Sequence, residues 1–234
     1  MNEKRIITYV IIIIFIIGII SFIHSPLFRV NKIEIYNLKI LNKSDIMDKL
    51  GSYYNKNLFL IDTENIKNDI SHIDYIKDLN INKTLPNQIE INVEERTPLA
   101  KIDNEGQYLV LNKDGFILEE SSSSLKADVP LIQGMGYSFE NEQRLSLSTV
   151  LDETLIALKN VSSTSLGEIK KIEYKDEKLE AKISRSVPVY LGETTKLNDK
   201  FKLLSAVINK VEEENLNIEY INIEKPEKPV IKPK

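Results

Sequence analysis

Few residues of this chain could carry catalysis or hold a metal. The sequence has two histidines, His24 and His72, and no cysteine, which excludes disulfides, thiolate nucleophiles and thiolate zinc sites. The histidines fall in different predicted regions, and neither has the neighbours that a catalytic triad or a two-histidine metal site requires. We therefore expect no catalytic, cofactor-binding or metal-binding residues.

The carboxylate pairs of the chain are poor candidates for acid–base chemistry. Glu94–Glu95 and Glu119–Glu120 could be taken for the two acids of a glycosidase, but adjacent residues of a strand point to opposite faces. The sequence contains no Gly-rich phosphate loop and no Gly-x-Ser-x-Gly elbow. The net charge of the chain is -4, whereas a nucleic-acid-binding protein usually carries an excess of basic residues. The sequence thus predicts neither an enzyme nor a nucleic-acid partner.

A long apolar segment occupies residues 6–23. As a helix, these 18 uncharged residues would span about 27 Å of a lipid bilayer. Lys4 and Arg5 precede the segment and the next basic side chain is Arg29, so residues 1–5 are expected to be a cytoplasmic tail and the rest to be extracytoplasmic. A cleaved signal peptide would have a shorter apolar region and a small-x-small site. An uncleaved single-pass anchor is therefore predicted.

Residues 28–97 have the pattern of a small β-α-α-β-β module. A strand at residues 30–36 alternates apolar and polar side chains, and polar caps at Asn42–Asp45 and Asp62–Thr63 each begin a helix. Two further alternating runs are joined by residues 84–88, which favour a hairpin.

Residues 98–224 predict a mixed domain dominated by an antiparallel β-meander, which makes the fold class α+β. Hairpins are expected at 109–118 and 172–183, and a further strand at 187–191. Helices are expected at 147–158 and 197–211, before a final strand at 218–223. Residues 225–234 contain Pro226, Pro229 and Pro233 among charged residues, and predict an extended, solvated tail.

The order of these elements resembles that of a known family. The anchor is followed directly by a POTRA-like module that closes on Val93–Ala100, and the pattern continues through residues 108–118, 129–134 and 220–223. The whole set is similar to the FtsQ/DivIB family of bacterial cell-division proteins.

That resemblance implies a non-enzymatic scaffold at the division septum, which binds FtsL-type and FtsB/DivIC-type membrane proteins and helps control septal peptidoglycan synthesis. In that family the terminal strand is the usual docking edge, where a partner segment adds by main-chain hydrogen bonds. Carried over residue by residue, the candidate partner-binding residues are Ile218, Glu219, Tyr220, Ile221, Asn222 and Ile223, with Phe201 and Leu204 on the flanking helix. The chain departs from the family's usual acidic and basic pair, having Asn222 and Glu224.

A second hypothesis is an anchored envelope protein that uses its POTRA-like module in export or assembly of other polypeptides. Transporters of that class carry a membrane β-barrel after such modules, and the 234 residues show no pattern for one. An anchored hydrolase is a third possibility, and it lacks a nucleophile constellation.

Overall fold

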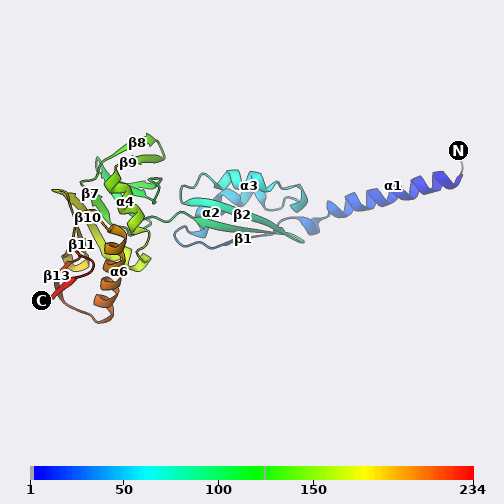
Figure 1. Cartoon of the computed structure of the whole chain (residues 1–234). Helices are drawn as coiled ribbons and strands as arrows, with labels where there is room; N and C mark the ends of the chain where they lie inside the picture. The colour runs from blue at the N-terminus through cyan, green and yellow to red at the C-terminus, as the bar shows by residue number, and fades with distance from the viewer. Residues whose placement is uncertain (1–2, 124) are drawn as a thin grey trace. The chain divides into compact units, whose positions relative to one another are not determined.

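The computed structural model describes residues 3–123 and 125–234 (Figure 1). Its internal contacts divide the chain into two compact units, Met1–Glu95 and Arg96–Lys234. Residues 1–2 of the predicted cytoplasmic tail lie outside the described residues.

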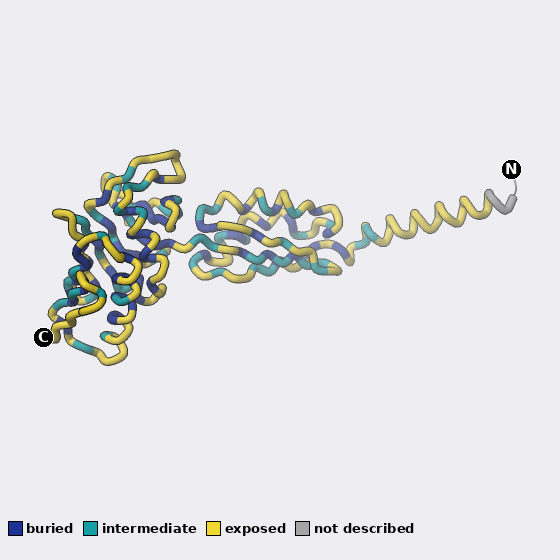
Figure 2. Tube along the Cα trace, viewed as in Figure 1, coloured by how far each residue is buried: buried dark blue, intermediate teal, exposed yellow. Residues whose placement is uncertain are grey.

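The first unit begins with helix α1, Glu3–Ile23. Its window Ile6–Ile23 has a mean hydropathy of 3.1 and buries none of its surface against the protein, as the continuous exposed stretch in Figure 2 shows. An apolar helix exposed on every face is stable in a lipid bilayer and not in water. The helix is therefore suited to anchor the chain in a membrane.

The rest of the first unit confirms the predicted β-α-α-β-β order. Its elements are β1 (Lys32–Tyr36), α2 (Lys43–Leu50), α3 (Thr63–Ile70), β2 (Ile76–Thr84) and β3 (Gln88–Glu95). The sheet order is β1-β3-β2, in which β1 and β3 are parallel and β2 and β3 form the predicted antiparallel hairpin.

Local chemistry fixes the ends of these elements. The Asp62 carboxylate accepts a hydrogen bond from the Glu64 amide at 3.0 Å, which satisfies a free donor at the start of α3. The Glu95 carboxylate accepts hydrogen bonds from the amides of Ile40 and Leu41 at 2.9 and 3.1 Å. The end of β3 thereby holds the segment that leads into α2.

The second unit is built on one large mixed sheet, with helices packed beside it. The strands and helices are β4 (Ala100–Asn104), β5 (Gln107–Leu111), β6 (Ile117–Ser121), β7 (Leu131–Gln133), β8 (Tyr137–Asn141), β9 (Arg144–Leu147), α4 (Thr149–Leu158), α5 (Ser163–Glu168), β10 (Ile169–Lys175), β11 (Lys178–Ile183), β12 (Val187–Gly192), α6 (Leu197–Glu213), β13 (Ile218–Asn222) and β14 (Val230–Pro233). The nine-stranded sheet has the order β14-β13-β12-β11-β10-β7-β4-β5-β6, and β8 and β9 form a separate hairpin.

Antiparallel neighbours dominate this sheet, in agreement with the predicted fold class. The structure adds three parallel pairings, β4–β7, β7–β10 and β12–β13. The last of them follows from α6, which provides the crossover that a parallel pair needs. The helix packs against α4 and α5, and its apolar face, including Leu197, Phe201, Leu204 and Ile208, is buried.

Candidate partner-docking site

The predicted docking strand, β13, lies next to the last strand at one end of the nine-stranded sheet. On one side it pairs in parallel with β12, where Asn222 is opposite Tyr190. On the other side it pairs antiparallel with β14, where Tyr220 is opposite Lys232 and Asn222 is opposite Val230. The edge of β13 away from β12 is therefore occupied by a segment of the same chain.

The direction of the backbone groups decides which residues of β13 could pair with a partner strand. The Ile223 amide donates to the Tyr190 carbonyl oxygen at 2.8 Å. Because successive residues of a strand turn their backbone groups to opposite sides, the Ile221 amide also faces β12. The backbone groups of Tyr220 and Asn222 face the other way, toward β14.

The predicted partner-binding side chains divide into a buried and an accessible set. Those of Ile218, Ile221, Ile223, Phe201 and Leu204 are at most 3% exposed and belong to the core. Glu219 is exposed, and Tyr220 and Asn222 are half-buried. A partner that approached this edge would thus meet Glu219, Tyr220 and Asn222, while the buried set supports the strand from behind.

The accessible side chains combine an aromatic ring with a carboxylate. The rings of Tyr190 and Tyr220 meet edge to face, with centroids 6.0 Å apart. From β14, the Lys232 Nζ lies 5.6 Å from the Tyr220 ring centroid and 2.9 Å from Glu219 Oε2. The hydrogen bond to the Glu219 carboxylate raises the pKa of Lys232. The docking edge therefore favours a cation opposite Tyr220.

Two lysines at the start of α6, Lys196 and Lys200, interact with residues near the docking strand. Lys200 is 1% exposed, and its Nζ donates to the Glu193 carbonyl oxygen at 2.6 Å. Burial lowers the pKa of Lys200. Lys196 forms an exposed ion pair with Glu227, which raises the pKa of Lys196 and lowers that of Glu227. The Lys196–Glu227 pair thereby connects the start of α6 to the segment that leads to β14.

Sequence reasoning missed β14 and its Lys232. The signal for them was present, because Val230 and Ile231 are adjacent apolar residues in an otherwise charged, proline-rich segment. Residues 230–233 are extended and exposed, but residues 225–228 form a turn and the extended part pairs with β13, which the prediction of a solvated tail did not include.

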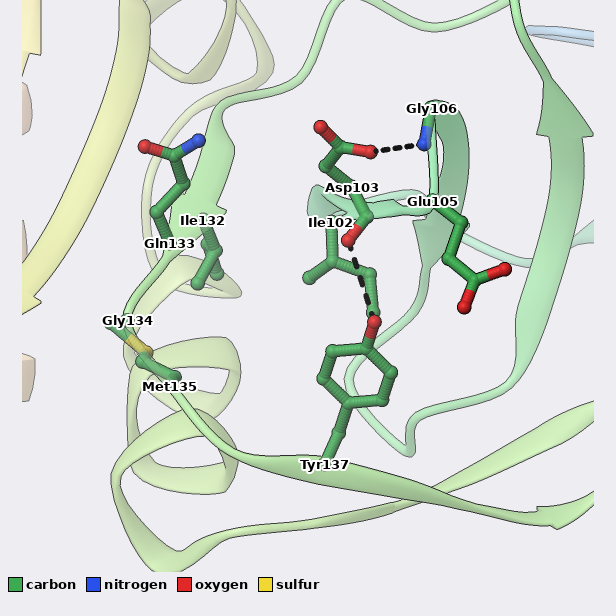
Figure 3. Close-up of a pocket in the computed structure, with 9 residues that line it drawn as sticks. All are labelled: Ile102, Asp103, Glu105, Gly106, Ile132, Gln133, Gly134, Met135 and Tyr137. Carbon is green, nitrogen blue, oxygen red and sulfur yellow. Dashed lines mark hydrogen bonds between the residues drawn. The ribbon is translucent and has the colours of Figure 1, made fainter.

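A hollow lined partly by charged residues lies elsewhere in the second unit (Figure 3). It has a volume of about 510 Å³ and lies between the β4–β5 turn and the loop from β7 to β8. The Asp103 carboxylate accepts from the Gly106 amide at 2.9 Å, and the Tyr137 hydroxyl donates to the Asp103 carbonyl oxygen at 3.4 Å. These polar groups stabilise the turn itself and form no nucleophile–base pair.

The histidines do not form a site in the described part of the chain. His24 Nδ1 lies 2.9 Å from the Ile20 carbonyl oxygen, one turn earlier in sequence, and His72 is exposed at the end of α3. Within residues 3–123 and 125–234, no three histidine, aspartate or glutamate side chains are grouped so that they could hold a metal ion.

Comparisons with known proteins match both units. Residues 28–96 match the family model "POTRA domain, FtsQ-type", and residues 100–224 match "Cell division protein FtsQ/DivIB, C-terminal". Cell division protein DivIB of Clostridium tetani is 24% identical over 94% of this chain and 85% of its own length. DivIB of Clostridium botulinum is 29% identical over 68% of this chain and 62% of its own length, so that this match spans less than two thirds of the relative.

A solved structure is also similar to this chain. It is the major extracytoplasmic domain of the cell-division protein DivIB from Geobacillus stearothermophilus, with 16% identity and a TM-score of 0.37. The match covers 50% of this chain and 97% of that one.

Proposed function

The chain belongs to the FtsQ/DivIB family of cell-division proteins, and we propose that it is a membrane-anchored, non-enzymatic scaffold of the division machinery. In this role it binds FtsL-type and FtsB/DivIC-type single-pass proteins on the outer face of the membrane. By holding them at the septum it helps control septal peptidoglycan synthesis.

The observation that carries this proposal is the outer edge of β13. The backbone groups of Tyr220 and Asn222 face away from the body of the sheet, and the strand that pairs with them is four residues long and exposed throughout. A sheet edge that is covered only by such a short, exposed strand becomes a template for an extended partner segment once that strand is displaced. Glu219 and Tyr220 beside that edge supply side-chain contacts that can select the segment.

The buried residues behind the edge make it rigid. Ile221 and Ile223 are 0% exposed, and so are Phe201 and Leu204 of α6. A docking strand fixed in this way binds without first becoming ordered, which lowers the entropic cost of association.

The experiment that tests this function follows a fluorescently tagged full-length chain in dividing cells and identifies its co-purifying membrane proteins. We expect recruitment to midcell together with small coiled-coil division proteins. Uniform distribution in the envelope without those proteins would contradict the proposal.

The docking edge is tested by Asn222→Pro, with Asn222→Ala as the matched control. The proline removes an amide that faces the docking side and leaves the pairing with β12 intact. The alanine removes the same side chain, including its hydrogen bond to the Glu224 amide, but keeps the backbone donor. We expect Asn222→Pro to lower partner recovery about tenfold and Asn222→Ala to have a much smaller effect. Equal recovery with both variants would argue against strand addition at β13. Ile221 is unsuitable for this test because its amide faces β12.

A further inference from the structure

The outer edge of β13 carries the chain's own strand β14, which we call the cover strand (residues Val230–Pro233). It is the last strand of the sheet at this end, close to the point marked C in Figure 1. The cover strand occupies the edge at which the proposed function places a partner. A partner strand and the cover strand cannot pair with Tyr220 and Asn222 at the same time.

The cover strand is a poor template for further strands. The Lys234 amide donates inward to the Asn217 carbonyl oxygen at 2.9 Å. Alternation along the strand then turns the amides of Lys232 and Val230 inward as well, and puts residues 229, 231 and 233 on the outer side. Two of these three are Pro229 and Pro233, which have no amide hydrogen. Within the cover strand, Ile231 thus has the single outward donor, and a partner strand has little to pair with there.

The attachment of the cover strand is weak. All four of its residues are exposed, so little apolar surface is buried by its pairing. Its Lys232–Glu219 ion pair has both side chains 50% exposed, and the Lys196–Glu227 pair before it is equally open to solvent. Exposed ion pairs contribute little and are screened by salt. A short strand held in this way opens readily.

We propose that the cover strand is a built-in competitor for the docking edge, so that a partner segment binds β13 by displacing it. This inference rests on the proposed function. The contacts of the cover strand also describe the segment that replaces it: an extended stretch with a lysine or arginine opposite Tyr220 and next to Glu219. The chain would therefore bind weakly to segments that lack such a cation.

Two proline variants of the full-length chain test the pairing between the cover strand and β13, one by weakening it and the other as its matched control. Val230→Pro removes an inward amide and weakens the pairing with β13, whereas Ile231→Pro removes the outward amide and leaves the pairing in place. Both positions are exposed and both variants keep every charge, so the sheet apart from the cover strand is expected to keep its fold in each.

The first readout is amide hydrogen exchange of Tyr220 and Asn222 in the purified full-length chain, which needs no partner. We expect exchange about tenfold faster in Val230→Pro than in the unchanged chain, with Ile231→Pro close to the unchanged chain. Equal exchange in all three chains would overturn the inference, because the protection of the Tyr220 and Asn222 amides would then not depend on the cover strand.

The second readout is the amount of single-pass division proteins, identified by mass spectrometry, that co-purify with each tagged chain from the same cells. We expect several-fold more with Val230→Pro than with Ile231→Pro or the unchanged chain. Equal recovery with all three chains would overturn the competitor inference and leave the scaffold function standing. Recovery with none of them would contradict the scaffold function, and the competitor inference with it.

Discussion

Single residues of the second unit show how a small number of groups define the candidate site. Two backbone positions, Tyr220 and Asn222, face the docking side of β13, and one carboxylate, Glu219, lies beside them. The cation on the Tyr220 ring comes from Lys232, which sequence reasoning had assigned to a solvated tail. The role of each of these residues depends on the side of the strand to which its backbone groups and its side chain point.

That direction could not be read from the sequence. The pattern of residues 218–223 predicts a strand with apolar side chains on both faces, which agrees with the burial of Ile218, Ile221 and Ile223. It does not determine which amides face a neighbouring strand, because that depends on the parallel register with β12. The predicted set of partner-binding residues therefore includes core residues such as Phe201 and Leu204 together with the accessible ones.

In the first unit, a buried tyrosine makes the free energy of unfolding depend on pH in the alkaline range. Tyr53 is 6% exposed, and its hydroxyl donates to Asp69 Oδ2 at 2.5 Å. Burial, and then the hydrogen bond to Asp69, raises the pKa of Tyr53 to about 12. A raised pKa means that the neutral hydroxyl stabilises the folded state fully below the unfolded pKa of about 10, and that this stabilisation is lost as the pH rises toward 12.

We expect the difference in unfolding free energy between the unchanged chain and Tyr53→Phe to be constant below about pH 10. Between about pH 10 and 12 it should shift by about 2 kcal/mol in favour of the variant, which has no group to ionise there. Urea unfolding of both proteins across this range measures the difference. Parallel curves over the whole range would show that the Tyr53 hydroxyl is not selectively stabilised in its neutral form.

At the scale of elements, the sequence predicts those helices and hairpins that are determined by interactions between residues close in sequence. The hairpins β2–β3, β5–β6 and β10–β11 and the helices α2, α3, α4 and α6 were all expected from caps, turns and periodicity. The three-residue strand β7 was not predicted as a bridge between β4 and β10, because its partners are distant in sequence. The β8–β9 hairpin was missed as well, although Tyr137 and Phe139 of β8 alternate with polar residues.

The short helix α5 was missed for a different reason. Its six residues include a glycine and three hydroxyl side chains, which are weak helix formers. The Ser162 side chain caps it by accepting from the Ser165 amide at 3.2 Å, and packing against α6 completes its stabilisation. Tertiary contacts thus determine this element more than propensity does.

The junction between β7 and β10 can be tested at Gly134. Its φ is +78°, and a Cβ there would lie 2.0 Å from the Tyr174 carbonyl oxygen. Gly134→Ala should therefore destabilise the second unit by about 3 kcal/mol or more, because backbone strain and a backbone clash add together.

Gly106 provides the matched control for that substitution. It also has a positive φ, +88°, but no atom lies within 4 Å of the position that a Cβ would take. Gly106→Ala should cost only the left-handed strain of about 1 kcal/mol. Urea unfolding compares the two variants, and equal destabilisation would mean that Gly134 is not confined by its neighbour.

At the scale of the whole molecule, an apolar helix and two folded units share one chain, and family membership assigns that chain to cell division. The helix α1 has the length and hydropathy of a membrane span, and Lys4 and Arg5 before it predict that the folded units lie outside the cytoplasm. The scaffold role depends on that orientation, because the docking edge must face the same compartment as the outer parts of its partners.

The orientation can be measured because the chain has no cysteine. Asn2→Cys and Glu180→Cys each introduce one thiol, the first before the apolar segment and the second at an exposed position of β11. A membrane-impermeant maleimide should label intact cells at position 180 and should label position 2 only after permeabilisation. The reverse pattern would contradict the predicted orientation.

The measurement that tests the central claim most directly is photo-crosslinking in dividing cells from an unnatural amino acid at position 219, beside the docking edge. The matched control places the same group at the exposed Phe139 of β8. We predict crosslinks from position 219, and none from position 139, to small single-pass division proteins. Crosslinks to those proteins from position 139 but none from position 219 would contradict docking at β13.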